Sequence, residues 1–125
     1  MHPAPAHYPR PAPIDAYGNG GFRFADMSHR GSLIIVPSGI YAWDVAQIDE
    51  VTPASLEAVL REIAPPGFLL LGTGATHLFP SEPVRRMFAE AQVGLEPMTT
   101  GAACRTFNVL LAEHRDVSAA LIAVD

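Results

Sequence analysis

Lysine is absent from this 125-residue chain, and all eight basic residues are arginines. A Walker-type phosphate loop, a Schiff-base enzyme and a lysine general base all need lysine, so the sequence excludes these chemistries. The chain also carries 13 acidic residues and a formal net charge of −5. Because no basic stripe offsets this charge, we expect no nucleic acid partner.

The sequence predicts neither an internal disulfide nor a membrane-spanning segment. Cys104 is the single cysteine, so no internal disulfide can form, which suits a reducing compartment. The longest nearly uninterrupted apolar runs, Leu33 to Val36, Phe68 to Leu71 and Ala119 to Val124, are far shorter than the roughly 20 residues that cross a bilayer. The N-terminal segment lacks the apolar centre of a secretory signal. We therefore expect a cytoplasmic protein.

The composition predicts one folded domain. Hydrophobic residues make up 49% of the chain and charged residues 17%, which is too apolar for a disordered protein. Residues 1–13 alternate proline and alanine, and we expect them to form a flexible arm. Residues 14–125 form the expected domain, and the bias towards Ala, Arg and Pro favours a GC-rich bacterial source.

Early strands and later helices follow from the spacing of apolar residues. Alternation around Gly18–Gly21 predicts a β-hairpin, and the turn at Pro37–Gly39 predicts a second pair of strands. Helices are predicted after the capping residues Thr52, Ser81 and Thr99 or Thr100, because apolar residues there recur every three or four positions. The helical positions that we expect to be buried are Leu56, Leu60, Ile63, Val84, Phe88, Phe107 and Leu111.

The order of these elements predicts an α/β fold in three layers. Phe68 to Leu71 is a continuous apolar run, typical of a strand that is covered on both faces. Strands alternate with helices from there to Ala119–Val124. We therefore expect a mixed central sheet with the helices on one face and the N-terminal hairpin as a further β layer.

The loop Gly72-Thr73-Gly74 is the first candidate site. It follows a buried strand and precedes a helix, so its backbone N–H groups can cradle an anion at the carboxyl edge of the sheet. A dinucleotide fingerprint would need a third glycine where His77 stands. A plain turn therefore explains these residues as well as a ligand loop does.

The start of the third helix is the second candidate. Thr100 lies at this helix terminus, with Arg105 and Asn108 within two turns, and a helix terminus with an arginine is favourable for an anion. An ordinary cap, with Arg105 paired to an acidic neighbour, is the alternative. If both candidates are correct, Gly72, Thr73 and Gly74 lie near Thr100 and Arg105 in one cleft that binds a ligand or a partner.

No catalytic or metal-binding constellation is expected. Cys104 with His77 or His114 would supply a thiol nucleophile and its base, but Cys104 falls on the apolar stripe of its helix and is predicted to be a core thiol. The five histidines never approach metal-ligand spacing, so we expect neither a metal nor a cofactor.

Several ordered segments resemble the domain-of-unknown-function family 498. They are Gly18–Phe22, Gly31–Pro37, Trp43, Leu70–Gly74 and Met98–Thr100, followed by Ala102, Ala103, Thr106, Asn108, Leu110, Glu113 and Arg115. The resemblance covers about residues 14 to 124. This family includes mitochondrial respiratory complex I assembly factor 3 and a vertebrate adipogenesis-associated protein.

The resemblance implies the three-layer Mth938-like fold but no known reaction. It also implies a protein partner, such as a respiratory-complex subunit or another assembly factor. We therefore expect a non-catalytic assembly or interaction protein, and the resemblance implies the assembly of respiratory complex I as its role. The alternative is an enzyme or sensor that binds a small anion between the Gly72–Gly74 loop and the start of the third helix.

Overall fold

A computed structural model describes residues 6–125 of the chain, which hold two sheets, three α-helices and one short 3-10 helix. The elements follow one another as β1 (Ile14–Gly18), β2 (Gly21–Phe24), β3 (Met27–Arg30), β4 (Ser32–Val36), β5 (Gly39–Trp43), η1 (Ile48–Glu50), α1 (Pro53–Leu60), β6 (Phe68–Gly72), α2 (Glu82–Glu90), β7 (Gly94–Met98), α3 (Thr100–Ala112) and β8 (Ser118–Leu121). The expected α/β class is confirmed.

The five-stranded sheet is mixed, as predicted, and has the order β5-β4-β8-β6-β7. β4 runs antiparallel to both β5 and β8, whereas β6 runs parallel to both β8 and β7. β6 is therefore an interior strand, in agreement with its apolar sequence. The last strand in the chain, β8, lies at the centre and joins the antiparallel half of the sheet to the parallel half.

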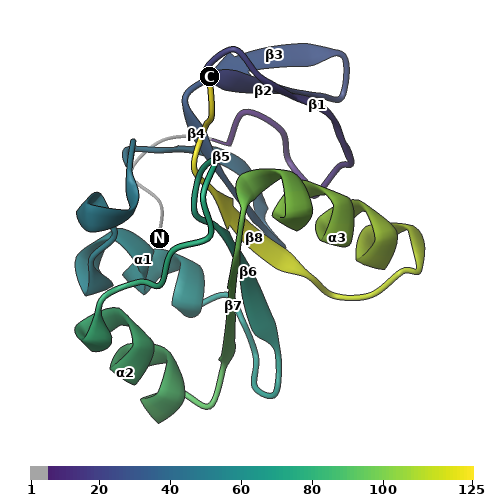
Figure 1. Ribbon diagram of the computed structural model, residues 1–125. Helices are drawn as coiled ribbons and strands as arrows, with labels where there is room; N and C mark the ends of the chain where they lie inside the picture. The colour runs from purple at the N-terminus through teal and green to yellow at the C-terminus, as the bar shows by residue number, and fades with distance from the viewer. Residues whose placement is uncertain (1–5) are drawn as a thin grey trace.

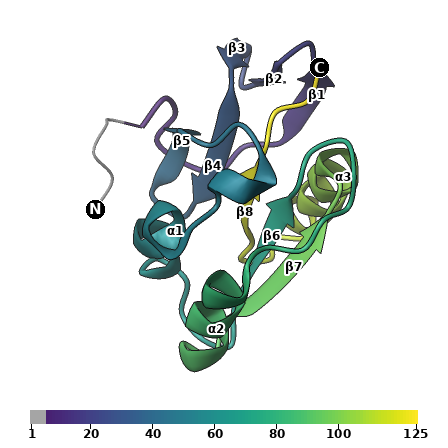
Figure 2. The same cartoon turned by 60° about the vertical axis from the view of Figure 1, so that its left-hand side comes forward.

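Each face of this sheet has its own hydrophobic core. Leu69 and Leu71 of β6 pack with residues of α1 and α2, while Leu70 points to the opposite face and packs with residues of α3. Figures 1 and 2 show α3 across the sheet from α1 and α2. Successive strand residues point to opposite faces, so a strand that is apolar throughout can serve both cores.

The position of α3 differs from the expectation that all helices cover one face. From β6 the chain moves through α2 to β7 at the sheet edge, and from β7 it moves back through α3, past β6, to β8. Crossovers between parallel strands are almost always right-handed, so two crossovers in opposite directions place their helices on opposite faces. Helical periodicity indicates that each helix has an apolar face but does not indicate which side of the sheet covers it.

Helix packing agrees with the predicted apolar stripes. Five of the seven residues expected to be buried are buried, and Leu60 and Leu111 are half-buried against the same cores. Thr52 caps α1 with its side chain, and Thr99 caps α3 in the same way. Each side-chain oxygen accepts a backbone N–H that would otherwise lack a partner.

The N-terminal layer is a three-stranded sheet rather than a hairpin alone. β3 was not predicted, because its burial alternates only between half-buried and exposed residues. The turn before it places two non-glycine residues, Ala25 (φ 48°) and Asp26 (φ 60°), in the left-handed region. Phe22 and Phe24 of β2 pack on the α3 side of the central sheet, and Gly20 donates a hydrogen bond to the carbonyl oxygen of Val124 at 2.8 Å.

The expected flexible arm, residues 1–13, is only partly described. Met1–Pro5 lie outside the described residues. Beyond them, the chain runs beside β5: His7 donates a backbone hydrogen bond to Ile40 at 2.8 Å, and Ile40 donates one to Tyr8 at 2.9 Å. Ala12 is buried. His7 and Tyr8 are therefore held at the edge of β5, which offers them hydrogen-bond partners.

Candidate functional site

The carboxyl ends of the three parallel strands lie together beside the start of α3 (Figure 1). A hollow of about 870 Å³ opens there. Thr73 and Gly74 line it after β6, Thr99 lines it after β7, and Ile122 lines it after β8. In open α/β sheets, the crevice outside the carboxyl ends of strands is where ligands bind, most often at the point where the chain reverses direction across the sheet.

Thr100 joins all three strand ends. Its hydroxyl accepts a hydrogen bond from the Gly74 N–H at 3.0 Å and donates one to the carbonyl oxygen of Ile122 at 2.6 Å. Its own N–H donates to the carbonyl oxygen of Gly74 at 2.9 Å. Thr100 is fully buried, so it acts as a structural link beneath the hollow and does not line it.

Two glycines allow this close approach. A Cβ atom on Gly72 would lie 3.0 Å from both the Cα atom and the hydroxyl of Thr100. Gly74 has a φ of +102°, which side-chain-bearing residues rarely adopt. Gly72 is therefore explained by packing of the β6 end against α3, and Gly74 by its backbone conformation.

Backbone donors at this site are mostly used within the fold. Thr73 donates its N–H to the carbonyl oxygen of Met98 at 2.8 Å, and Ala102 donates to the Thr99 side chain at 3.2 Å. The Thr73 hydroxyl donates to the carbonyl oxygen of Thr76 at 2.6 Å. The N–H groups of Gly74 and Thr100 were expected to be free to bind an anion, but both have partners within the fold. The site therefore offers fewer free backbone donors than the sequence predicted.

Arg105 supplies the positive charge on the rim of the hollow, which Asp49 and Asp125 also line. It is exposed on α3 and, within residues 6–125, forms no ion pair, in contrast to the acidic partner that the cap interpretation expected. Tyr17 reaches the same rim from β1, and its hydroxyl lies so close to Gly101 that a Cβ atom there would overlap it. The structure therefore brings the Gly72–Gly74 loop, Thr100 and Arg105 together.

Asn108 lies apart from the hollow. Its side-chain amide donates to the carbonyl oxygen of Ile14 and its side-chain oxygen accepts from the N–H of Ile14, both at 2.8 Å. This pair of bonds attaches β1 to α3. Asn108 was grouped with Arg105 by sequence proximity alone, but three residues further along α3 its side chain faces a different neighbour, Ile14.

Other lining residues were not found from the sequence. Residues 46–49, Tyr17 and Leu78 also line the hollow. Leu78 is 40% exposed and Tyr17 is 43% exposed. They come from segments far apart in the chain, and no local pattern marks them as neighbours.

The chemistry of Cys104 agrees with a core thiol. Its side chain is buried. Burial raises the pKa of the Cys104 thiol to about 12, although the nearby charge of Arg105 opposes this shift. A thiol with such a pKa is a poor nucleophile at neutral pH. In the part of the chain that the structure covers, no three His, Cys, Asp or Glu side chains gather as metal ligands would.

A family of unknown function, DUF498/DUF598, matches residues 14–122. The chain belongs to this family. An uncharacterised protein of Rhodobacter capsulatus is 37% identical over 110 residues, which cover 88% of this chain and 83% of that protein. NADH dehydrogenase (ubiquinone) 1 alpha subcomplex assembly factor 3 of Xenopus tropicalis is 30% identical over 112 residues, which cover 87% of this chain but 60% of that protein.

Solved structures share the fold. The crystal structure of an outer membrane protein from Bartonella henselae is 52% identical, has a TM-score of 0.87, and aligns over 95% of this chain and all of its own. An NMR structure from Bordetella pertussis, described as an Mth938-like domain, is 29% identical with a TM-score of 0.72, over 98% of this chain and 91% of that one. The expected Mth938-like fold is confirmed. Among the described residues, no helix has both the length and the apolar character to cross a membrane.

Proposed function

We propose that this chain is a non-catalytic interaction protein that assists the assembly of respiratory complex I. The observation that carries the proposal is the alignment of 87% of the chain with a protein named as an assembly factor of NADH dehydrogenase. The assembly factors of Mus musculus and Drosophila melanogaster align over a similar share of the chain, at 27% and 29% identity. Because the chain spans only about 60% of these relatives, the partner and the step in assembly are part of the proposal.

The hollow at the strand ends supports binding of a protein. Its exposed side chains include an aromatic residue, Tyr17, an aliphatic residue, Leu78, and the guanidinium of Arg105. Tyrosine and arginine are enriched at the energetic centres of protein interfaces. We propose that a respiratory-complex subunit or a second assembly factor docks here, with no cofactor and no nucleic acid taking part.

The proposed place of action is the cytoplasmic face of the inner membrane of a bacterium. In this proposal the partner protein supplies the contact with the membrane, so this chain does not need a spanning helix. The relatives from Bartonella henselae and Francisella tularensis that are described as membrane proteins are compatible with work beside a membrane. Fractionation of cells into cytosol, inner membrane and outer membrane would check this location.

A deletion strain tests the function. The amount of assembled complex I is measured on native gels stained for NADH dehydrogenase activity, after deletion of the gene in its source organism. We expect deletion to lower this amount, wild type to restore it, and Arg105→Gln to restore it less. Arg61→Gln, which removes the same charge from the C-cap of α1, is the matched control and should restore it fully. An unchanged amount of complex I after deletion would refute the function.

A small-anion site is the second candidate, because Arg105 faces the hollow without an ion pair in residues 6–125. Titration calorimetry with inorganic phosphate distinguishes the two. Stoichiometric phosphate binding that is lost in Arg105→Gln, together with normal complex I in the deletion strain, would favour an anion-binding enzyme or sensor.

A further inference from the structure

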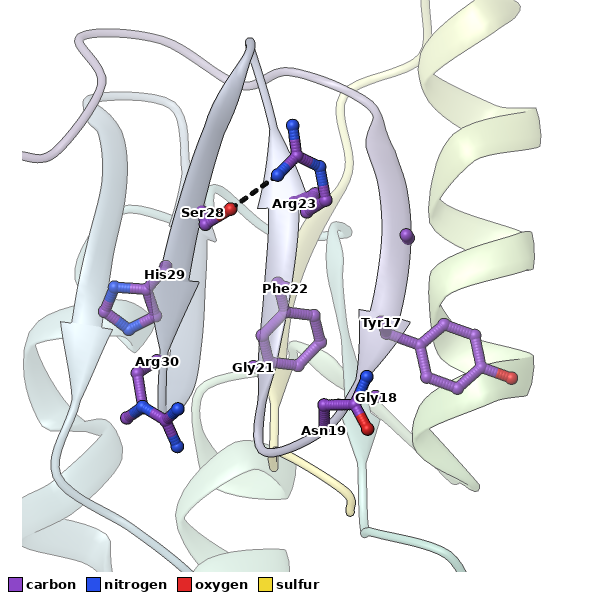
Figure 3. Close-up of a pocket in the computed structure, with 10 residues that line it drawn as sticks. Tyr17, Gly18, Asn19, Gly21, Phe22, Arg23, Ser28, His29 and Arg30 are labelled. Atoms are coloured by element: carbon purple, nitrogen blue, oxygen red, sulfur yellow. Dashed lines mark hydrogen bonds between the residues drawn. The ribbon is translucent and has the colours of Figure 1, made fainter.

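The outer face of the N-terminal sheet carries a second hollow, of about 380 Å³ (Figure 3). It is lined only by residues of β1, β2, β3 and their turns, between Ala16 and Arg30. Tyr17 lines both this hollow and the one at the strand ends, so the two adjoin.

Strand register explains how the hollow forms. Arg23 on β2 lies opposite Ser28 on β3, and Arg30 lies opposite Gly21. Arg23 and Gly21 are two residues apart on β2 and so share a face of the sheet. Arg30, which pairs with Gly21, lies on that same face, so both arginines project from the same side of the sheet. On β1 the residue opposite Arg23 is Ala16. Small residues therefore separate the two long side chains and leave a depression between them.

Gly21 is required at the floor of this depression. A Cβ atom there would overlap the carbonyl oxygen of His29 on the neighbouring strand. Opposite Gly21 on β1 stands Gly18, whose φ is +126°. The floor thus has no side chains at these two positions.

The charge of this surface is opposite to that of the molecule. The whole chain has a net charge of −5, yet no carboxylate lines the hollow. Across residues 6–125, Arg23 and Arg30 form no ion pair, whereas Arg61 and Arg86 each pair with a glutamate one helical turn away. Arg23 donates to the Ser28 hydroxyl at 2.7 Å, which orients its guanidinium and leaves further N–H donors free to bind an anion.

We infer that this hollow binds an acidic, extended segment of a partner protein. The inference rests on the proposed function, because it assumes that the chain works by binding another protein. The two arginines stand on neighbouring strands, and their positions are offset by two residues, which is roughly 7 Å along the strand direction. Alternate side chains of an extended peptide have a similar spacing, so acidic residues at positions i and i+2 can each face one of the two arginines. Figure 3 shows these groups at different heights along the strands.

A single small anion and an anionic membrane fit less well. A single small anion is disfavoured by the directions of the two guanidinium groups, which Figure 3 shows turned towards opposite ends of the strands. A membrane would meet the whole sheet at once, including exposed Asp15 on β1 and exposed Asp26 in the turn after β2. Neither carboxylate lines the hollow, so both repel a flat anionic membrane more than a narrow peptide bound within the hollow.

The test uses the full chain and a fluorescein-labelled peptide with glutamate at alternate positions, measured by fluorescence anisotropy at low ionic strength. We expect Arg23→Gln/Arg30→Gln to bind the peptide about tenfold more weakly than wild type, since two charge-assisted contacts are lost. Arg61→Gln/Arg86→Gln removes the same net charge from the C-cap of α1 and from α2, and should bind as wild type does. Amide NMR shifts from the peptide should fall between Ala16 and Arg30.

Three results would overturn the inference. The first is equal peptide binding by the wild type and the Arg23→Gln/Arg30→Gln variant. The second is a set of NMR shifts confined to the surroundings of Arg105. The third is binding to phosphatidylglycerol vesicles that depends on Arg23 and Arg30 while the peptide does not bind, which would assign the surface to lipid. Failure here leaves the complex I phenotype of the deletion strain unaffected, so the two proposals are separately testable.

Discussion

Gly74 and Thr100 exchange two hydrogen bonds: the Gly74 N–H donates to the Thr100 hydroxyl at 3.0 Å, and the Thr100 N–H donates to the Gly74 carbonyl oxygen at 2.9 Å. The hydroxyl also donates to Ile122 at 2.6 Å. One buried threonine thereby fixes the ends of β6 and β8 to the start of α3. The geometry of the larger hollow depends on this residue.

Thr100→Val should lower the free energy of unfolding by about 1–3 kcal/mol, because the variant leaves a buried N–H and a buried carbonyl oxygen without a partner. Urea denaturation measures the change. Thr106→Val, the same substitution at a half-buried position of the same helix, is the control and should change stability by less than about 0.5 kcal/mol. Equal effects of the two substitutions would contradict the linking role of Thr100.

Phe107 is fully buried between α3 and the central sheet. Phe107→Ala should destabilise the protein by about 3–5 kcal/mol, since it removes a large apolar side chain and leaves a cavity. Thermal and urea unfolding measure this loss. Val109→Ala in the same helix removes a side chain that is 57% exposed and should cost far less. A small loss in Phe107→Ala would mean that α3 does not pack as described.

Stability should fall as the solution becomes acidic, and His29 should contribute to this fall. Burial lowers the pKa of His29 below its ordinary value of 6.5, while the hydrogen bond to the carbonyl oxygen of Ser32 opposes the shift and the charge of His7 adds to it. The unfolded chain then binds the proton more readily, so the contribution of His29 is present above about pH 6.5 and is lost as the pH falls towards the lower folded pKa. Urea unfolding from about pH 7 to about pH 5 should show a weaker pH dependence in His29→Gln. An unchanged slope would refute this contribution.

The thiol of Cys104 should react slowly in the native protein. With a pKa of about 12, only about one thiol in ten thousand is ionised at pH 8, and burial hinders access as well. Labelling by a disulfide reagent should be slower by orders of magnitude in buffer than in denaturing urea. Rapid native labelling would indicate that the α3 face of the core opens readily.

The sequence was sufficient to predict elements whose signals are local. Apolar spacing identified all three helices, and the continuous apolar run at Phe68–Leu71 identified an interior strand. β3 was missed because its residues are half-exposed and its preceding turn uses Ala25 and Asp26 where glycine or asparagine is usual. Such a strand has neither an apolar pattern nor a typical turn before it, so the local sequence does not reveal it.

Prediction of the site was also limited to residues that local sequence patterns or strand order bring together. Gly72–Gly74 and Thr100 follow parallel neighbouring strands, so topology alone placed them at one edge. Asn108, in contrast, contacts Ile14, 94 positions earlier in the chain, and no spacing rule predicts that pair. Arg23 and Arg30 were overlooked because seven residues separate them in sequence, although strand pairing places them two positions apart on one face.

The central position of β8 determines when the sheet can close during synthesis. β5 and β4 form one fragment and β6 and β7 another, and only Ser118–Leu121 pairs with both. Until these four residues emerge from the ribosome, the central sheet of the nascent chain consists of two separate strand pairs, each with an unpaired edge. The domain must therefore complete its core after translation of β8, and removal of Ser118–Leu121 should abolish the fold rather than shorten it.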